Sequence, residues 1–186
     1  CERIWIDETY VEYAGRDQTL ERFAEKSNNV YVCKSMSKVY ALSGLRAAYL
    51  CANPKNVRPL KQITPPWVIS LPAQIASTHA LKQEDYYLKK YQETHALRDK
   101  LELELKQIGI DEIIPGIANF IMFHVSNDKF SASRIVNECK KKKLYLRDLS
   151  VMGASFEDNA IRMAVKDIDT NKKMIQTFGE IINQLN

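Results

Sequence analysis

Cysteine, histidine and long apolar runs are all scarce in this sequence, and each shortage narrows what the chain can be. Among 186 residues there are four cysteines and three histidines, and neither set shows C-x-x-C or another metal-ligand spacing. We therefore expect no metal site, and a reducing, cytoplasmic setting. No apolar run is long enough to span a bilayer, and no segment has the pattern of a secretory signal.

An excess of charge of one sign is also absent. The chain has 27 Lys and Arg against 23 Asp and Glu, a net charge of +4, and 45% of its residues are apolar. The lysines at 140–143 form the one dense basic cluster, and at a helix end such a run is typical of a solvated face. We therefore expect neither a nucleic-acid partner nor a membrane partner. The length suits one core-bearing domain, or a domain with a small appendage.

The most informative stretch lies at residues 30–46. The run Val30-Tyr31-Val32-Cys33 predicts a buried strand, because β-branched and aromatic residues fill it. Two hydroxyls and two cations come at or beyond the end of that strand: Ser35, Ser37, Lys38 and Arg46. Hydroxyls donate hydrogen bonds, and the guanidinium fork fits phosphate oxygens, so this spacing predicts an anion pocket.

A second apolar run, Ile4-Trp5-Ile6, predicts a strand covered on both faces, because apolar residues occupy consecutive positions. Asp7 and Glu8 end this strand, and Tyr10 follows on the loop. Ligands of open α/β sheets gather outside the carboxyl ends of strands, so an acid at this position is well placed for a ligand.

Apolar periodicity predicts the remaining elements. We expect helices over 72–81, 84–108 and 131–142, strands over 119–125, 144–147 and 160–165, and an irregular proline-bearing crossing over 54–66. Gly109 should end the long helix, and Thr170 can cap the last one. Strands that alternate with helices indicate an α/β fold with a mixed or parallel sheet.

Two motifs carry a resemblance to a known family. Ser-x-Ser-Lys at 35–38, followed by Gly-Leu-Arg at 44–46, resembles the cofactor-lysine segment of fold-type I pyridoxal-phosphate (PLP) enzymes. Trp-Ile-Asp-Glu-Thr-Tyr at 5–10 resembles the Asp-Glu-x-Tyr segment that precedes it in class I/II aminotransferases. The ordered set is similar to the histidinol-phosphate aminotransferase and threonine-phosphate decarboxylase branch.

The resemblance implies a fold and a division into domains. We expect an α/β structure: part of a PLP-transferase large-domain sheet, mixed and mostly parallel, plus a small C-terminal α/β domain. Residues 1–82 would be the C-terminal part of the PLP-binding large domain, 83–109 a long interdomain helix and 110–186 the small domain. In the family the Asp strand lies near the middle of a much longer chain, so we expect the C-terminal portion of a larger enzyme.

The resemblance also implies roles toward the cofactor, pyridoxal 5′-phosphate. Lys38 would bind it through its amine and then act as acid and base at the substrate Cα. Asp7 would keep the pyridine nitrogen protonated, and Tyr10 would hydrogen-bond the ring oxygen O3′. The cofactor phosphate would be held by Ser35, Ser37 and Arg46.

Substrate recognition would fall to the small domain. Arg162 matches the family's late arginine, whose planar fork suits a carboxylate, and Asn119 matches a position beside that site. Arg147 matches an arginine that helps to hold the far end of phosphate-bearing substrates. This late pair of arginines on adjacent predicted strands favours the histidinol-phosphate-like branch. Considered without the resemblance, Asp7 could merely cap a turn, and Arg147 could form a structural salt bridge with Asp148 or Glu157.

The implied activity is PLP-dependent, ping-pong transfer of an amino group between an amino acid and a 2-oxo acid, in amino-acid metabolism, by a homodimeric parent enzyme. Two alternatives stay open. One is decarboxylation of a phosphorylated amino acid with the same cofactor, and the other is a non-catalytic remnant retained for assembly. Relatives carry further cofactor contacts in an N-terminal half that cannot be assigned here, so the fragment alone could bind PLP weakly or be inactive.

Overall fold

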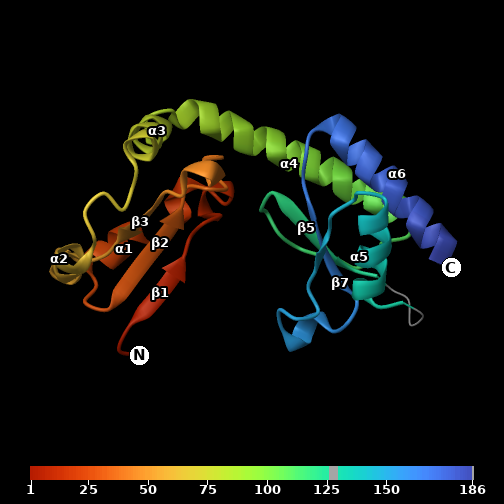
Figure 1. Ribbon diagram of the computed structural model, residues 1–186, viewed down its shortest axis with the longest axis horizontal. Coiled ribbons are helices and arrows are strands. Elements are labelled where there is room, and N and C mark those ends of the chain that lie inside the picture. The colour runs from red at the N-terminus through yellow and green to blue at the C-terminus, as the bar shows by residue number, and fades with distance from the viewer. Residues whose placement is uncertain (126–129, 186) are drawn as a thin grey trace. The chain divides into compact units, whose positions relative to one another are not determined.

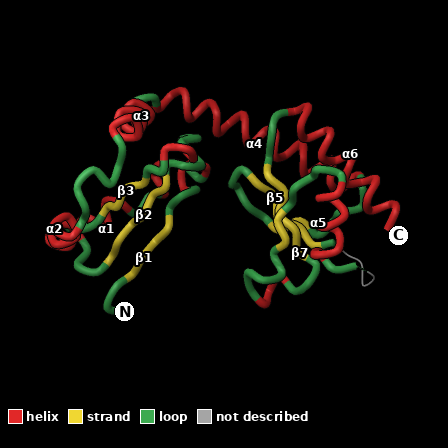
Figure 2. Tube along the Cα trace, viewed as in Figure 1, coloured by secondary structure: helices red, strands yellow, loops and turns green. Residues whose placement is uncertain are grey.

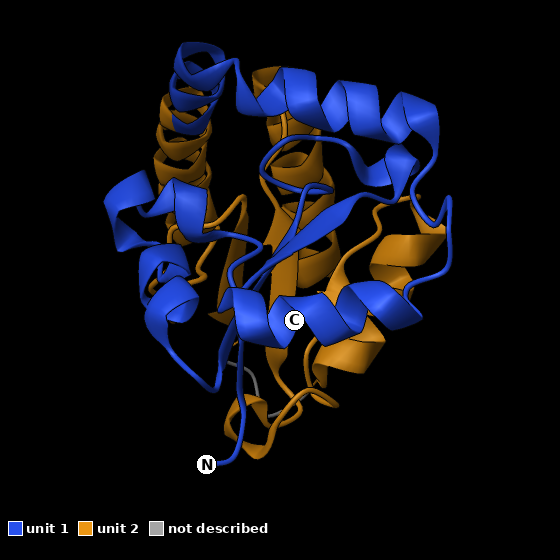
Figure 3. Ribbon diagram, turned by 90° about the vertical axis from the view of Figure 1, so that its left-hand side faces the viewer, with its two compact units in different colours: residues 1–91 blue, residues 92–186 orange. Residues whose placement is uncertain are grey.

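The computed structural model describes residues 1–125 and 130–185, and it divides into two compact units, residues 1–91 and 92–186 (Figure 3). Each unit has its own sheet and its own core. Helix α4 (Glu84–Gln107) contributes residues to both units. Within the described ranges, no helix combines the length and the apolar character that a membrane crossing requires.

The sheet of the first unit contains β1 (Ile4–Asp7), β2 (Val30–Ser35) and β3 (Ala48–Cys51), in that order (Figure 1). β1 and β2 are parallel and β2 and β3 are antiparallel, so the sheet is mixed, as predicted. The expectation that β1 is covered on both faces is wrong for the described structure, because Ile4 is 41% and Trp5 56% exposed. The strand is an edge strand of the sheet, and the ring of Tyr31 stacks on the Trp5 ring with a centroid distance of 4.5 Å.

Short helical segments connect these strands. They are the 3-10 turns η1 (Val11–Tyr13), η2 (Arg16–Gln18) and η3 (Ser43–Leu45), and helix α1 (Glu21–Lys26). Ala24 of α1 packs on Val30 and Val32 of β2 in a small core on one face of the sheet. A second cluster joins Tyr13 and Tyr40 to Tyr91 of α4, and it covers the turns that follow β1 and β2.

Residues 54–63 form a helix, α2 (Pro54–Ile63), where the sequence predicts an irregular crossing. The prediction is wrong because Pro54 occupies the first helical position, where no N–H is needed, and because Asn53 caps the helix by accepting from the Lys55 amide at 3.0 Å. Pro59 lies inside the helix on its exposed side. The prolines at 65 and 66 lie outside any helix, as predicted, and α3 (Leu71–Leu81) begins beyond them.

The second unit has an antiparallel sheet in the order β4-β5-β7-β6, and its central strands β5 and β7 are labelled in Figure 2. Its elements are β4 (Ile113–Ile114), β5 (Phe120–His124), α5 (Ala132–Lys141), β6 (Arg147–Asp148), the 3-10 turn η4 (Ala154–Phe156), β7 (Ala160–Ala164) and α6 (Ile168–Leu185). One face of the sheet is fully buried against the three helices, with core residues Ile121, Phe123, Ile161, Met163, Leu101, Ile135 and Phe178. The opposite face is therefore the one left for a ligand.

Two predictions in this unit need correction. The strand expected over 144–147 shrinks to Arg147–Asp148, because Leu144 belongs to the C-terminal cap of α5 and donates its amide to the Cys139 carbonyl at 2.9 Å. The cap of α6 is Asp167 rather than Thr170, since Asp167 Oδ1 accepts from the Thr170 amide at 2.9 Å. The end of α4 is as predicted, with Gly109 just beyond it at a φ of 85°.

Candidate active site

The residues predicted to hold the cofactor gather at one end of the three-stranded sheet, where the carboxyl ends of β1 and β2 lie. We call this end the site edge. Asp7 pairs with Cys33 across the parallel strands, and Ser35 lies two residues further on, so both side chains sit at the carboxyl ends. Ala48 pairs with Ser35 at the start of the antiparallel strand β3, and Arg46 precedes Ala48 by two residues. Register therefore brings Arg46 to the same edge, which the tips of the β1 and β2 arrows mark in Figure 1.

The turn after β2 is held by its own hydrogen bonds. The hydroxyls of Ser35 and Ser37 lie 2.7 Å apart, and the Ser37 amide donates to the Ser35 hydroxyl at 3.3 Å. The amide of buried Met36 donates to the Ala47 carbonyl at 3.1 Å, which ties the turn to the segment before β3. Lys38 is exposed at the end of this turn, and within the described residues no hydrogen bond or ion pair occupies its amine. That amine is available to a ligand.

Asp7 does cap a turn, as considered for a lone acid at this position. Its Oδ1 atom accepts hydrogen bonds from both the amide and the hydroxyl of Thr9, the amide at 2.9 Å. Both bonds go to Oδ1, and within the part of the chain that the structure describes no hydrogen bond occupies Oδ2, so this atom can serve a ligand. Burial raises the pKa of the Cys33 thiol, and the Asp7 charge raises it further. This coupling agrees with the two side chains lying on the same face of the sheet.

Tyr10 and Arg46 flank this edge. Tyr10 is half-buried and packs against the cluster that covers the turns. Arg46 is exposed and has a left-handed backbone with a φ of 52°, a conformation that residues other than glycine rarely adopt. Its Nη1 donates to the Ser43 carbonyl at 2.9 Å, which turns the guanidinium back along the loop. The remaining N–H groups of that guanidinium can serve an anion.

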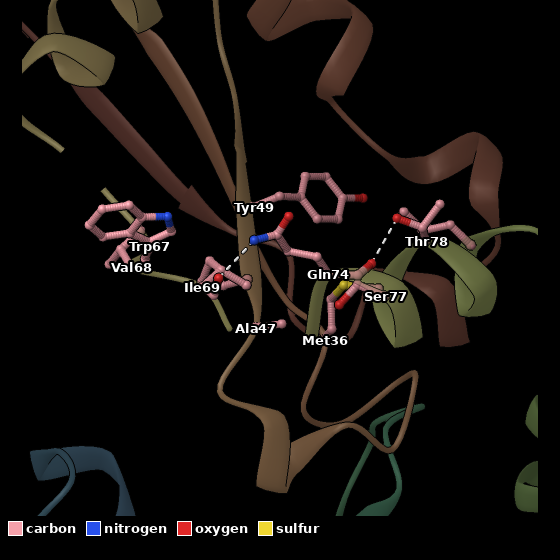
Figure 4. A pocket seen from close by; sticks show the side chains of 11 residues that line it. Met36, Ala47, Tyr49, Trp67, Val68, Ile69, Gln74, Ser77 and Thr78 are labelled. Atoms are coloured by element: carbon pink, nitrogen blue, oxygen red, sulfur yellow. Dashed lines mark hydrogen bonds between the residues drawn. The ribbon is translucent and has the colours of Figure 1, made fainter. Parts of the chain in front are cut away.

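A mostly apolar hollow of about 530 Å³ borders the same edge (Figure 4). Met36, Ala47 and Ala48 form part of its wall, and they are chain neighbours of the predicted phosphate-binding residues. Tyr49, segment 67–69 and helix α3 form the rest of the wall, and the Gln74 side chain donates to the Ile69 carbonyl at 2.8 Å. Trp67 is 91% exposed at the mouth. The hollow offers apolar surface beside the polar site.

A buried ionic cluster that the sequence motifs do not predict surrounds Lys34. Its Nζ lies 3.4 Å from a carboxylate oxygen of Glu8, 3.1 Å from one of Glu12 and 3.2 Å from one of Glu21. Burial lowers the pKa of Lys34, but the hydrogen bonds and charges of Glu12 and Glu21 outweigh it and raise the pKa. The available signal was a lysine inside an otherwise apolar strand, which requires a buried partner.

A polar hollow of about 600 Å³ lies beside this cluster, and Glu12, Glu21 and Lys34 form part of its wall. Tyr49 donates its hydroxyl to Glu21 Oε1 at 2.8 Å, and burial raises the pKa of Tyr49 strongly. The second oxygen of Glu12, Oε2, is buried and has no hydrogen-bond partner among the described residues. The cluster therefore holds more carboxylate than ammonium.

In the second unit, Arg147 and Arg162 lie directly opposite each other on β6 and β7. Their predicted placement on adjacent strands is confirmed. Opposite residues of an antiparallel pair share a face, and like charges in that position are unfavourable without a counter-ion. The Arg162 guanidinium also lies over the ring of Phe120, 5.0 Å from its centroid. The pair is suited to an anionic ligand on the face opposite the core.

The structural salt bridge considered for Arg147 is not seen within the described residues. Asp148 Oδ1 instead accepts from the amide of Ser150 at 2.9 Å, and Arg147 is exposed. Asn119 is half-buried just before β5, and its carbonyl accepts from the Val165 amide at 2.9 Å. This bond fixes the backbone of Asn119 beside the strand pair that carries the two arginines.

Comparison with known proteins places these features in a family. The family model for aminotransferase class I and II matches residues 3–178. A histidinol-phosphate aminotransferase of Archaeoglobus fulgidus is 31% identical over 181 residues, which make up 97% of this chain and 50% of that protein. The chain thus spans about half the length of the curated relatives it matches.

Solved structures agree in fold. The histidinol-phosphate aminotransferase from Sinorhizobium meliloti, crystallised in complex with pyridoxal-5′-phosphate, superposes with a TM-score of 0.88 at 21% identity, over 99% of this chain and 50% of that one. The L-threonine-O-3-phosphate decarboxylase from Porphyromonas gingivalis gives 0.77 at 17% identity, over 96% and 55%. The expected mixed α/β fold is confirmed, and the chain belongs to the class I and II aminotransferase family.

Proposed function

We propose that this chain is the C-terminal half of a PLP-dependent aminotransferase of the histidinol-phosphate aminotransferase branch. The enzyme would move an amino group between an amino acid and a 2-oxo acid. The observation that carries the proposal is the convergence of the predicted cofactor residues at one sheet edge: Asp7, Ser35, Ser37, Lys38 and Arg46. The family match over residues 3–178 supports it.

The chain's own residues fit the cofactor. PLP needs an unengaged amine, an acid for the ring nitrogen and donors for the phosphate. Lys38 offers an exposed amine, and Asp7 has one carboxylate oxygen outside its turn. When bound, PLP supplies a ring that withdraws electrons from the substrate Cα. By this proposal residues 1–82 complete the PLP-binding domain, 83–109 form the interdomain helix and 110–186 the small domain.

Each residue then has a definable task. Lys38 holds the cofactor and moves a proton at the substrate Cα, a general acid–base role that contributes about 10²–10⁴-fold to rate. Asp7 keeps a proton on the ring nitrogen, and Tyr10 donates to the ring oxygen. The cofactor phosphate is oriented by the remaining three: Ser35, Ser37 and Arg46.

Recognition of the substrate falls to the second unit. Arg162 binds the α-carboxylate, and Asn119 lies beside it. Arg147 binds a phosphate at the far end of the substrate. The direct pairing of the two arginines across β6 and β7 supports a substrate with two anionic groups. We further propose a cytoplasmic homodimer that acts in amino-acid metabolism.

Decarboxylation of a phosphorylated amino acid remains the second candidate, because it needs the same Lys38, Asp7 and Arg46. Orientation of the substrate at Cα decides between the reactions. Incubation of the full-length enzyme with a phosphorylated amino acid distinguishes them by the product, which is released carbon dioxide or a new 2-oxo acid. A non-catalytic remnant would yield neither, and the unengaged amine of Lys38 argues against one.

The deciding experiment is reductive trapping. The full-length enzyme is mixed with PLP, reduced with borohydride and digested, and the modified peptide is identified by mass spectrometry. Label confined to Lys38 is expected, with loss of that label in the Lys38→Arg variant. Label elsewhere, or none at Lys38, would contradict the proposal.

A further inference from the structure

We propose that Lys34 is a positioning residue of the cofactor site, whose buried ammonium fixes the segments that carry the cofactor-binding residues. The inference rests on the proposed function and extends it to a residue that does not itself touch the cofactor. Two observations support it: Lys34 joins several segments of the first unit, and predicted cofactor-binding residues are close neighbours of these segments in the sequence.

Lys34 joins three separate segments to β2. Its Nζ contacts Glu8 at the end of β1 at 3.4 Å, Glu12 in η1 at 3.1 Å and Glu21 at the start of α1 at 3.2 Å. The side chains of Lys34, Glu8 and Glu12 are 7%, 5% and 4% exposed. The ion pairs with Glu8 and Glu12 are therefore shielded from solvent, and their mutual attraction is stronger than that of pairs at the surface, whereas Glu21 is 29% exposed.

Two of the carboxylates also accept hydrogen bonds from further elements. Glu8 accepts from the Thr19 hydroxyl at 2.6 Å and from the Leu20 amide at 2.7 Å, and so holds the entry to α1. Glu21 accepts from the Tyr49 hydroxyl at 2.8 Å, and Tyr49 is the register partner of Lys34 on β3. One ammonium thus links β1, η1, α1 and β3.

Three of the joined segments, β1, β2 and η1, lead within a few residues to a predicted cofactor-binding residue. Glu8 follows Asp7, Lys34 precedes Ser35, and Glu12 lies two positions after Tyr10. Successive side chains of a strand point to opposite faces, so Lys34 lies behind the face that carries Ser35. The Glu8 amide donates to the Cys33 carbonyl at 2.9 Å, which extends the β1–β2 ladder to this point. The cluster is a support behind the site.

Removal of the ammonium would leave three carboxylates facing one another. Glu12 Oε2 already has no hydrogen-bond partner among the described residues, so this carboxylate is incompletely satisfied even with Lys34 in place. Breaking a buried ion pair by removing one partner is strongly unfavourable, because the remaining charge is uncompensated. The ends of β1 and β2 would separate, and Asp7 would shift relative to Ser35.

The test uses the full-length enzyme with PLP, and it reads cofactor affinity and the visible circular dichroism of the bound cofactor at saturation. Lys34→Met should raise the PLP Kd by about tenfold or more and alter the dichroism band, because small displacements of a positioned group have large effects. Lys34→Arg should keep the PLP Kd within about threefold of that of the unsubstituted enzyme and leave the dichroism band unaltered, since guanidinium can serve the same carboxylates.

Arg98→Met is the matched control. Arg98 is also 7% exposed, and it pairs with Glu102 at 3.2 Å within helix α4, which is not one of the segments that Lys34 joins. Its loss should lower the melting temperature while leaving the Kd and the dichroism band unchanged. Should Lys34→Met fail to fold, Glu21→Gln removes one charge and keeps a hydrogen-bonding oxygen, and about a threefold increase in Kd is expected.

A folded Lys34→Met variant with unchanged Kd and an unchanged dichroism band would overturn the inference alone. An unchanged Kd in Glu21→Gln would do the same if Lys34→Met does not fold. Failure of the unsubstituted enzyme to bind PLP would overturn the proposed function itself. The two failures are therefore distinguishable.

Discussion

Lys38 is exposed at the turn after β2 with its amine unengaged in the described structure, whereas three carboxylates surround the amine of Lys34. The role proposed for Lys38 needs an amine that no fixed partner occupies, whereas a buried structural charge needs compensating partners. The two lysines lie on one short segment, and their environments differ because strand alternation and the following turn place them differently. The roles that we propose for them follow from this difference.

Substitution of the two paired arginines should show which end of the substrate each of them binds. Arg147→Ala should raise the KM for a phosphate-bearing substrate by about tenfold to a hundredfold, because a hydrogen bond to a charged group contributes about 1.5–3 kcal/mol. The KM for a 2-oxo acid without phosphate should change little. Arg162→Ala should raise both values. Steady-state kinetics of the full-length enzyme would show this, and equal effects of Arg147→Ala on both substrates would contradict its assigned role.

Cys139 should resist alkylation in the folded protein. Burial raises the pKa of this thiol to about 11, and the side chain is fully inaccessible in the core of the second unit. A raised pKa leaves little thiolate at pH 8, and the thiolate is the reactive form. Mass spectrometry after iodoacetamide treatment should find Cys1 modified, since it is exposed, and Cys139 unmodified. Early modification of Cys139 would indicate that the core opens.

Among the helices and strands, those with a clear apolar periodicity could be predicted from the sequence. Helices α3, α4 and α5 and strands β5 and β7 follow from apolar spacing, with ends within a residue or two. Helix α2 does not follow from the sequence pattern, because prolines usually interrupt helices, although Pro54 fits a first turn. The predicted strand over 144–147 is too long at its start, because Leu144 is part of the C-terminal cap of α5 and not of the sheet.

Replacement of Pro59 should stabilise helix α2. The residue lies inside the helix and is exposed, so its ring leaves the Lys55 carbonyl without its helical donor. Pro59→Ala should increase the free energy of unfolding by about 1 kcal/mol, less than the full propensity difference, since much of α2 is exposed to water. Urea denaturation would measure this. The control is Pro54→Ala, at a position where proline is favourable, and a loss of stability in Pro59→Ala would contradict the argument.

Asp167 should stabilise helix α6 in a pH-dependent manner. Hydrogen bonds from the side chain and amide of Thr170 lower the pKa of Asp167 below its ordinary value. A lowered pKa means that the stabilisation is complete above the unfolded-state pKa and is lost as pH falls through the folded-state pKa. Asp167→Ala should therefore lower the melting temperature at pH 7 and have little effect near pH 2.

Asp169→Ala is the control for this prediction. Asp169 is in the first turn of the same helix and gives a similar change of charge, but it is not the capping residue. Its substitution should have the smaller effect at pH 7. An effect of Asp167→Ala that persists undiminished at low pH would show that its charge is not the source of the stability.

At the scale of the molecule, the candidate cofactor site could be predicted because the family motifs fall in order along the chain. Parallel pairing of β1 with β2 then brings Asp7 to the edge where Ser35 lies. The cluster around Lys34 could not be predicted in this way, because its four members come from segments that only tertiary packing brings together. Pairing of Arg147 with Arg162 was predictable only as adjacency of strands, and the register came from the structure.

The two units should differ in their ability to fold alone. The second unit has one continuous core that joins all three of its helices to one face of its sheet, and Leu101 and Leu105 of α4 belong to it. The first unit has two smaller clusters, an edge strand with exposed Trp5, and an exposed Trp67. Burial of apolar area is the main favourable contribution to folding, so a chain of residues 92–186 should be stable and one of residues 1–91 should not.

Expression of the two segments separately tests this difference. Residues 92–186 should unfold cooperatively in urea, and the amides of Ile121, Phe123, Ile161 and Met163 should exchange most slowly because they lie on the fully buried strands. Residues 1–91 should show a shallow transition and fast exchange throughout, because their apolar surfaces are incompletely covered. Equal urea midpoints for the two segments would mean that the Lys34 cluster and the tyrosine packing of the first unit stabilise it as strongly as the larger core stabilises the second.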